Sequence, residues 1–359
     1  MAPVAWSSGN ASAAHLHIQK TGGTTLYLDC IQRCSSTVAG RALQGFLSQD
    51  AASTDRGEPC GCRAFIDAHW TFHELSVVKR FARRRSFPLC LTTMIRDPAD
   101  RVISEYEFLR NGDNGPHALH QDQWDYIDQR QPSSKSGPPV LSPLGQRLLE
   151  RSKPFSLSDF IEHSPGHHPA INRQTRYLGS LEPRVWLEAP YPDGCCMNSV
   201  VRMGARRWAE HHFGLAVARE LDEMLGRVHR RMQSQPNASH ALPEQPTDAD
   251  LGRALSRIKY EFAVVGVLER APESALAFAK HLGWSSAWPR QRSALQHEDR
   301  LPWRRHQDVS PGLRQRILEK NQHDDVLYRL ANELLDGHVR DAHAWPRPRE
   351  RGGQVPVCL

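Results

Sequence analysis

The chain has 359 residues, 39% of them hydrophobic and 24% charged, which indicates a globular protein with a full core and excludes a fibrous or disordered chain. No run approaches the ~20 consecutive apolar residues of a membrane helix, so we expect no membrane-spanning segment and no signal peptide in this sequence. The formal net charge is +6, and Lys supplies only seven of the 46 basic residues. Either a codon bias or an anionic partner suited to the planar Arg fork explains the excess of Arg.

The first predicted strand leads through a glycine turn into a helix. After the turn, apolar residues recur at i, i+3, i+4 and i+7, as expected for an amphipathic helix: Tyr27, Cys30, Ile31 and Cys34. The pair Gly22 and Gly23 lets the backbone direct several N–H groups at one anion beside the helix N-terminus. Hydroxyl donors and one positive charge flank the pair: Lys20, Thr21, Thr24 and Thr25.

This turn predicts a phosphate cradle. It differs from a Walker A loop, in which the Lys follows the second glycine, because here Lys20 precedes both glycines. An ordinary turn capped by Thr remains an alternative for the same residues.

A second strand is predicted to end near His69, followed by a helix through Leu75, Val78 and Phe81. Four side chains in this region imitate a Cys₂His₂ zinc set: Cys60, Cys62, His69 and His73. We favour no metal site, because the Cys-x-Cys spacing is tighter than the usual two to four intervening residues.

The stretch 87–95 has apolar residues at both odd and even positions, so both faces of a strand here would be apolar. This predicts a central strand of a parallel sheet with both faces covered. Arg96 ends this strand, Asp97 is a natural N-cap, and Pro98 suits the first helical position. In the helix that follows, Ser104 lies about 200° around the axis from the apolar Val102. Arg96 and Ser104 can therefore face one crevice at the carboxyl edge of the sheet.

The remaining segments complete the expected α/β domain. Residues 111–155 are predicted to be a long insertion, 208–232 a helix, 233–248 a polar linker, 260–269 a second buried strand, 310–336 a helix and 337–359 a disordered tail. Eight cysteines are compatible with a few disulfides in a secretory compartment, although their pairing cannot be deduced. Asn10 and Asn237 begin glycosylation sequons.

Taken in order, these blocks resemble the Golgi carbohydrate sulfotransferases that use 3′-phosphoadenosine 5′-phosphosulfate, and among them the heparan sulfate 6-O-sulfotransferases. Residues 17–25 resemble the family's 5′-phosphosulfate loop, and residues 95–105 resemble its 3′-phosphate segment. Later blocks at 157–160, 172–178, 265–269 and 317–328 are also similar to the family. The resemblance covers most of residues 15–336 and implies a single P-loop-like domain, with a central parallel sheet flanked by helices, after a short tail at 1–14.

The resemblance also implies the site residues. Lys20 and residues 21–25 would bind the 5′ end of the donor, and Arg96 and Ser104 would bind its 3′-phosphate. His69 would be the catalytic base if the family's motif is aligned on Glu74, whereas an alignment on Trp70 would place Asp67 there. The acceptor would be contacted by Asn172, Gln174 and Arg176, although bracing of a loop is an equal alternative for these three.

The resemblance implies 3′-phosphoadenosine 5′-phosphosulfate as co-substrate, no required metal, an anionic polysaccharide as partner and no nucleic acid. The family is anchored in the Golgi membrane by an N-terminal helix, which this sequence does not contain. Uronyl 2-O-sulfation and a non-catalytic glycan-binding protein remain alternatives to glucosamine 6-O-sulfation. A P-loop kinase is disfavoured, because the central strand ends in Arg96 instead of an Asp for magnesium.

Overall fold

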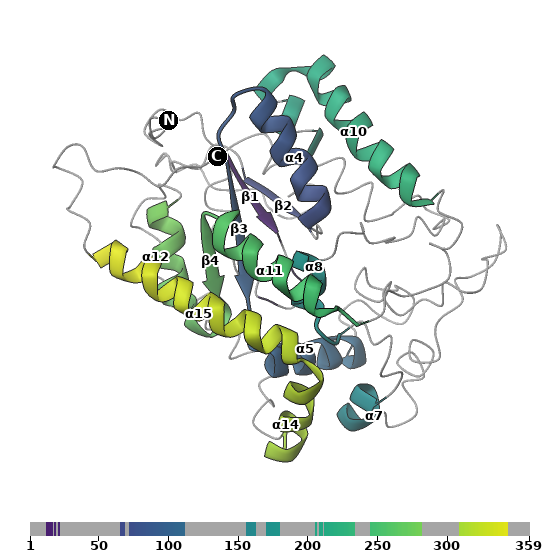
Figure 1. The fold of residues 1–359 in the computed structure, drawn as a ribbon, viewed down its shortest axis with the longest axis vertical. Coiled ribbons are helices and arrows are strands. Elements are labelled where there is room, and N and C mark those ends of the chain that lie inside the picture. The colour runs from purple at the N-terminus through teal and green to yellow at the C-terminus, as the bar shows by residue number, and fades with distance from the viewer. Residues whose placement is uncertain are drawn as a thin grey trace, which may run out of the picture.

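The computed structural model describes residues 12–16, 18, 21, 65–68, 72–111, 156–162, 170–179, 205–206, 208–210, 212–233, 245–281 and 309–343. Within these ranges the chain is an α/β structure in which helices surround a small parallel sheet (Figure 1). The strands are β1 (Ser12–Leu16), β2 (Phe65–Ala68), β3 (Leu89–Ile95) and β4 (Val264–Val267).

The helices between and after the strands vary in length from six to 22 residues. They are α4 (Phe72–Arg84), α5 (Pro98–Asn111), α7 (Leu157–Glu162), α8 (Arg173–Gly179), α10 (Leu215–Gln233), α11 (Asp248–Tyr260), α12 (Ala271–His281), α14 (Pro311–Lys320) and α15 (Gln322–His343). Among the described residues, no helix is both long enough and apolar enough to span a bilayer.

The four strands pair in the order β2-β1-β3-β4, and every pair is parallel. The registers align Leu16 with Ala68 and with Thr93, and Ile95 with Val267. The carboxyl ends of all four strands therefore lie at one edge of the sheet.

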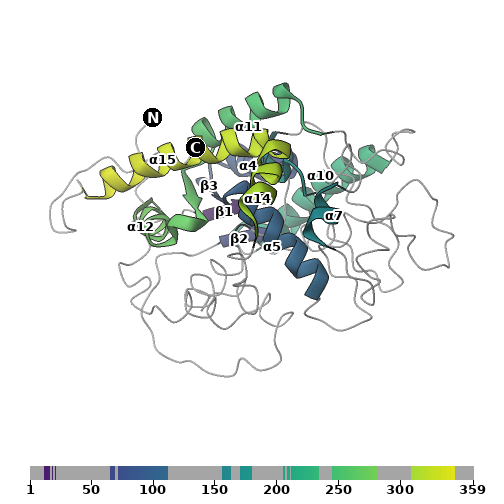
Figure 2. The ribbon, with the colours of Figure 1, turned by 90° about the horizontal axis from the view of Figure 1, so that it is seen from below.

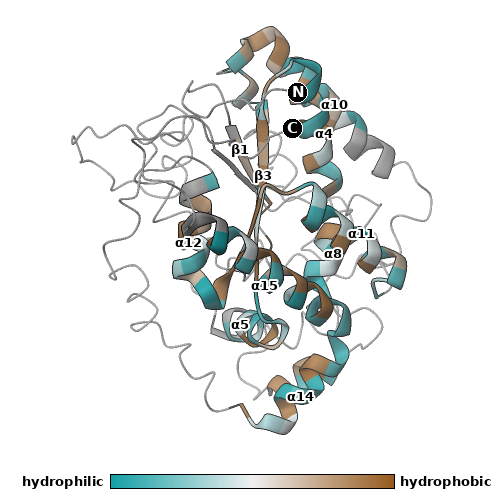
Figure 3. Cartoon of the chain, turned by 60° about the vertical axis from the view of Figure 1, so that its left-hand side comes forward, coloured by the Kyte–Doolittle hydropathy of each residue, from teal (hydrophilic) through white to brown (hydrophobic). Residues whose placement is uncertain are grey.

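Helices pack on the sheet, as predicted for a parallel sheet flanked by helices. All seven residues of β3 are buried, as predicted from the apolar residues on both faces of this strand. Helix α4 packs against β1 and β3, while α12 and α15 pack against β4 and against each other (Figure 2). Figure 3 shows hydrophobic residues along β3, whereas α15 carries both hydrophobic and hydrophilic residues along its length.

Packing between α12 and β4 requires a glycine at position 266. A Cβ atom there would lie 2.7 Å from both the Met94 sulfur and a ring carbon of Phe278. The absence of a side chain at Gly266 lets α12 approach the sheet closely.

Two predicted helices differ from the observed ones. The periodic pattern over 208–232 is interrupted at Gly214, which has a φ of 85°, so α10 begins only at Leu215. The pattern over 310–336 is divided at Asn321 into α14 and α15, and α15 continues to His343. The prediction of disorder from residue 337 is therefore wrong for 337–343, because His338 bonds to His281 of α12.

Candidate functional site

The strand order defines a topological switch point at the carboxyl edge of the sheet. The chain passes from β1 outward to β2 on one side, and from β3 outward to β4 on the other, so the order reverses between β1 and β3. Ligands of open α/β sheets bind outside the carboxyl ends of the strands at such a reversal. The ends of β1 and β3 are also joined by a hydrogen bond, 2.9 Å long, from the Thr93 hydroxyl to the Leu16 carbonyl oxygen.

The predicted phosphate loop follows β1, and Thr21 is the member of it that the structure describes. Thr21 is buried, and its hydroxyl donates a hydrogen bond of 2.8 Å to the Ile18 carbonyl oxygen. Its backbone N–H donates to the same oxygen, at 3.4 Å. In this structure the Thr21 hydroxyl therefore closes a turn, which differs from its predicted role as a phosphate donor. Other loop residues lie outside the described ranges: Lys20, Gly22, Gly23, Thr24 and Thr25.

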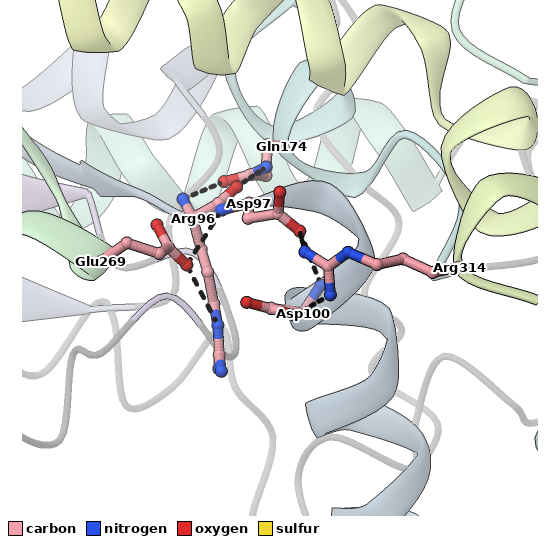
Figure 4. Close-up of polar contacts among 6 residues, drawn as sticks. All are labelled: Arg96, Asp97, Asp100, Gln174, Glu269 and Arg314. Atoms are coloured by element: carbon pink, nitrogen blue, oxygen red, sulfur yellow. Dashed lines mark hydrogen bonds and ion pairs between the residues drawn. The ribbon is translucent and has the colours of Figure 1, made fainter. Parts of the chain in front are cut away.

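Arg96 is the first residue after β3 and is held at its main chain by Gln174 of α8 (Figure 4). The Arg96 N–H donates to Oε1 of Gln174, and Nε2 of Gln174 donates to the Arg96 carbonyl oxygen, both at 2.9 Å. The Arg96 side chain extends away from Gln174 and passes Glu269, with 3.7 Å between Nε of Arg96 and Oε1 of Glu269. Arg96 thus presents its guanidinium from the carboxyl edge of the central strand.

The start of α5 is built as the sequence predicts. Asp97 accepts a hydrogen bond of 2.9 Å from the Asp100 N–H and is the N-cap, directly before Pro98. Arg314 of α14 donates to Oδ1 of Asp97 at 2.8 Å and also pairs with Asp100. Carboxylates therefore already occupy this helix N-terminus.

Glu269, two residues beyond β4, is the acidic neighbour of Arg96. Its Oε1 also accepts a hydrogen bond of 3.2 Å from the Asp97 N–H. Burial raises the pKa of Glu269, while Arg96 and this N–H partly oppose the rise. Burial, with the negative charge of Glu269, raises the pKa of Tyr328 to about 12. Glu269 is therefore a solvent-accessible but partly desolvated carboxylate, and Arg96 is the positive charge beside it.

Asn172 precedes α8 and braces two parts of the chain that are far apart in sequence. It has a φ of 49°, a left-handed conformation that Asn tolerates better than most residues. Its side chain donates to the Lys320 carbonyl oxygen and accepts from the Asp324 N–H, both at 3.3 Å. Its own N–H donates to Oδ1 of Asn321 at 2.8 Å. These contacts correspond to the bracing alternative, and a contact of Asn172 with the acceptor stays a prediction.

Helix α8 is held at both ends by charged side chains. At its start, Asp324 accepts hydrogen bonds from the N–H groups of Gln174, at 3.1 Å, and Thr175, at 2.7 Å. At its end, Arg253 donates to the Gly179 carbonyl oxygen at 2.8 Å, and Arg257 donates to that of Leu178. The signs of these charges also complement the helix dipole.

Arg101 and Glu105, which belong to the block resembling the 3′-phosphate segment, face the interior. Glu105 accepts hydrogen bonds of 2.6 Å from both Arg101 and Arg173, and all three side chains are buried. The spacing of Arg101 and Glu105 at i and i+4 in α5 is a sequence signal for the ion pair between them. Ser104 is half-buried one turn after Asp100, and Arg176 is buried in α8. No contact of either residue tests its predicted role in binding, so both roles stay predictions.

The predicted base lies outside the described residues, as do Cys60 and Cys62 of the zinc alternative. In sequence His69 directly follows Ala68, the last residue of β2, the strand that neighbours β1. His73 is half-buried in α4. Within the described ranges no cluster of three or more metal-binding side chains occurs.

Sequence reasoning did not assign roles to Glu269, Arg314 or Asp324. Glu269 has a local signal, since it directly follows the apolar run of the last strand. Arg314 and Asp324 act on residues about 150 to 220 positions earlier in the chain, which no local pattern reveals. No protein-family model and no curated protein sequence matches the chain.

Proposed function

We propose that the chain is a sulfotransferase that moves the sulfuryl group of 3′-phosphoadenosine 5′-phosphosulfate to a hydroxyl of an anionic polysaccharide. The observation that carries the proposal is the position of Arg96. It lies at the carboxyl end of β3, beside the end of β1, where the strand order reverses. The segment after β1 contains the predicted phosphate loop, so a nucleotide with phosphates at both ends fits this arrangement.

In the proposed reaction an acceptor hydroxyl oxygen attacks the sulfur in line, and the bond from sulfur to the bridging oxygen breaks. That oxygen leaves on the nucleotide with a negative charge, which Lys20 and the loop N–H groups would stabilise. His69 would take the proton of the attacking hydroxyl, a contribution of about 10²–10⁴-fold in rate. Arg96 and Ser104 would bind the 3′-phosphate and thereby distinguish this donor from ATP.

Glucosamine 6-O-sulfation of heparan sulfate-like chains is the proposed specificity, on the resemblance of the sequence blocks. A secretory location is part of the proposal, and it is supported by Cys90 of β3, which is disulfide-bonded. Disulfides persist mainly in oxidising compartments.

The test is transfer from radiolabelled donor to a panel of polysaccharides, with disaccharide analysis of the product. Wild-type protein is expected to label a heparan-like acceptor at the glucosamine 6-O position. Lys20→Ala and His69→Ala are each expected to lose at least about 100-fold in kcat, the scale of one electrostatic or general-base contribution.

The control is Arg227→Ala, which removes an exposed ion pair with Glu223 on α10 and should leave turnover unchanged. Binding of the polysaccharide without any transfer would favour the non-catalytic alternative. Label at a uronyl 2-O position would support the sulfotransferase reaction and contradict the proposed glucosamine 6-O specificity.

A further inference from the structure

The amide of Gln174 pairs with the main chain of Arg96 as a neighbouring strand would. The last pairing of β3 with β4 joins Ile95 to Val267, so Arg96 lies one residue beyond that ladder. Gln174 supplies one acceptor to the Arg96 N–H and one donor to its carbonyl oxygen. The direction in which the Arg96 side chain leaves the backbone is thereby fixed by a residue 78 positions later.

The support of Gln174 is itself rigid. Asp324 fixes the start of α8, and Arg253 and Arg257 fix its end. A Cβ atom on Gly179 would lie 2.1 Å from the Asp250 carbonyl oxygen, so α8 and α11 are in close contact there. Gln174 is fully buried on this support, and both polar groups of its amide are engaged with Arg96.

We propose that Gln174 is a positioning residue for Arg96 in binding the 3′-phosphate of the donor, and that it does not contact the acceptor. This assignment rests on the proposed function and deepens it. A phosphate bound to one Arg needs that guanidinium in a fixed orientation, because its N–H groups form a planar fork. The Gln174 side chain is also fully buried, which keeps its amide from reaching an acceptor in solution.

The test uses Gln174→Met, which keeps the side-chain length and removes both hydrogen bonds. The probes are adenosine 3′,5′-bisphosphate and adenosine 5′-monophosphate, which differ only in the 3′-phosphate. Calorimetry is expected to show that the wild-type protein prefers the bisphosphate. In the variant, the ratio of the Kd for the monophosphate to the Kd for the bisphosphate should fall about tenfold, the scale of a misplaced hydrogen-bonding group. The Kd for the monophosphate itself should change little.

A double-mutant cycle separates positioning from general structure. In an Arg96→Ala background, Gln174→Met is expected to cause no further loss of preference, because its effect passes through Arg96. Gln174→Glu, which can still accept from the Arg96 N–H, should give an intermediate preference and serves if the Met variant does not fold. Arg227→Ala is the control, since it removes only an exposed ion pair with Glu223 on α10 and should leave the preference unchanged.

The opposite results would overturn the assignment. These are an equal loss for both nucleotides, a loss that persists without Arg96, or a rise in the KM for polysaccharide alone. A wild-type protein that binds the bisphosphate no better than the monophosphate would overturn the proposed function, and this assignment with it.

Discussion

Glu269 is a partly desolvated carboxylate whose protonation should affect stability. Burial raises its pKa in the folded protein above the ordinary value, so the folded protein holds the proton more tightly than the unfolded chain does. The stabilisation from that proton is complete below the ordinary pKa and is lost as the pH rises through the raised one. At neutral pH the ionised carboxylate therefore lowers the free energy of unfolding.

Glu269→Gln should consequently stabilise the protein at neutral pH and have little effect near pH 4. The amide can still accept the hydrogen bond from the Asp97 N–H, so the change mainly removes the charge. Urea unfolding at the two pH values measures the difference. Glu220→Gln, which alters an exposed pair with Arg85, is the control and should show no such dependence. A larger gain at pH 4 than at pH 7 would contradict this explanation.

Helix α8 shows that a short helix can depend on side chains outside it. Seven residues are too few for a helix to be stable alone in water. Its first N–H groups and last carbonyl groups are satisfied by Asp324, Arg253 and Arg257, none of which belongs to it. Its stability therefore comes from α11 and α15.

Asp324→Ala should destabilise the protein by about 1–3 kcal/mol, because it leaves two buried N–H groups without their acceptor. Thermal unfolding followed by circular dichroism measures this loss. The matched control is Asp325→Ala at the next position, where the carboxylate pairs with the exposed Arg329 and should contribute less than about 1 kcal/mol. Equal losses in the two variants would show that the capping of α8 is not what Asp324 contributes.

The parts of the fold that could be predicted depend on neighbouring residues. The buried strand before Arg96, the cap at Asp97 and the proline at position 98 all have signals within a few positions, and all three are confirmed. The divisions at Gly214 and Asn321 were missed, because the apolar pattern continues across both and only the backbone geometry interrupts it.

The candidate site was predicted less completely, because its support comes from distant segments. Arg96 was identified from its place at a strand end, and its position agrees with that prediction. Gln174 was assigned to the acceptor, since a sequence cannot show that both groups of its amide are bonded to another residue's backbone. The predicted base and most of the phosphate loop lie outside the described residues, so those assignments stay predictions.

The whole molecule also depends on a covalent link through its central strand. Cys90 is buried in β3 and disulfide-bonded, and it is the one cysteine among the described residues. The disulfide ties the middle of the sheet covalently and restricts the unfolded chain.

Cys90→Val, which keeps the site apolar, should cost about 2–4 kcal/mol of unfolding free energy under oxidising conditions. The difference from the wild-type protein should disappear in dithiothreitol, because both proteins then lack the bond. Guanidinium unfolding with and without reductant measures it. A cost of the same size in both conditions would mean that packing at position 90, and not the disulfide, is responsible.

The hydrogen bonds that Asn172 and Gln174 make with Asn321 and with Asp324 of α15 have a consequence for biosynthesis. They join residues 149 to 152 positions apart, and the helix that contributes Asp324 is the last one described in the chain. During translation, β3 and Arg96 leave the ribosome long before the residues that fix α8. The main chain of Arg96 therefore gains its fixed support from α8 only after the chain has been synthesised through Asp324.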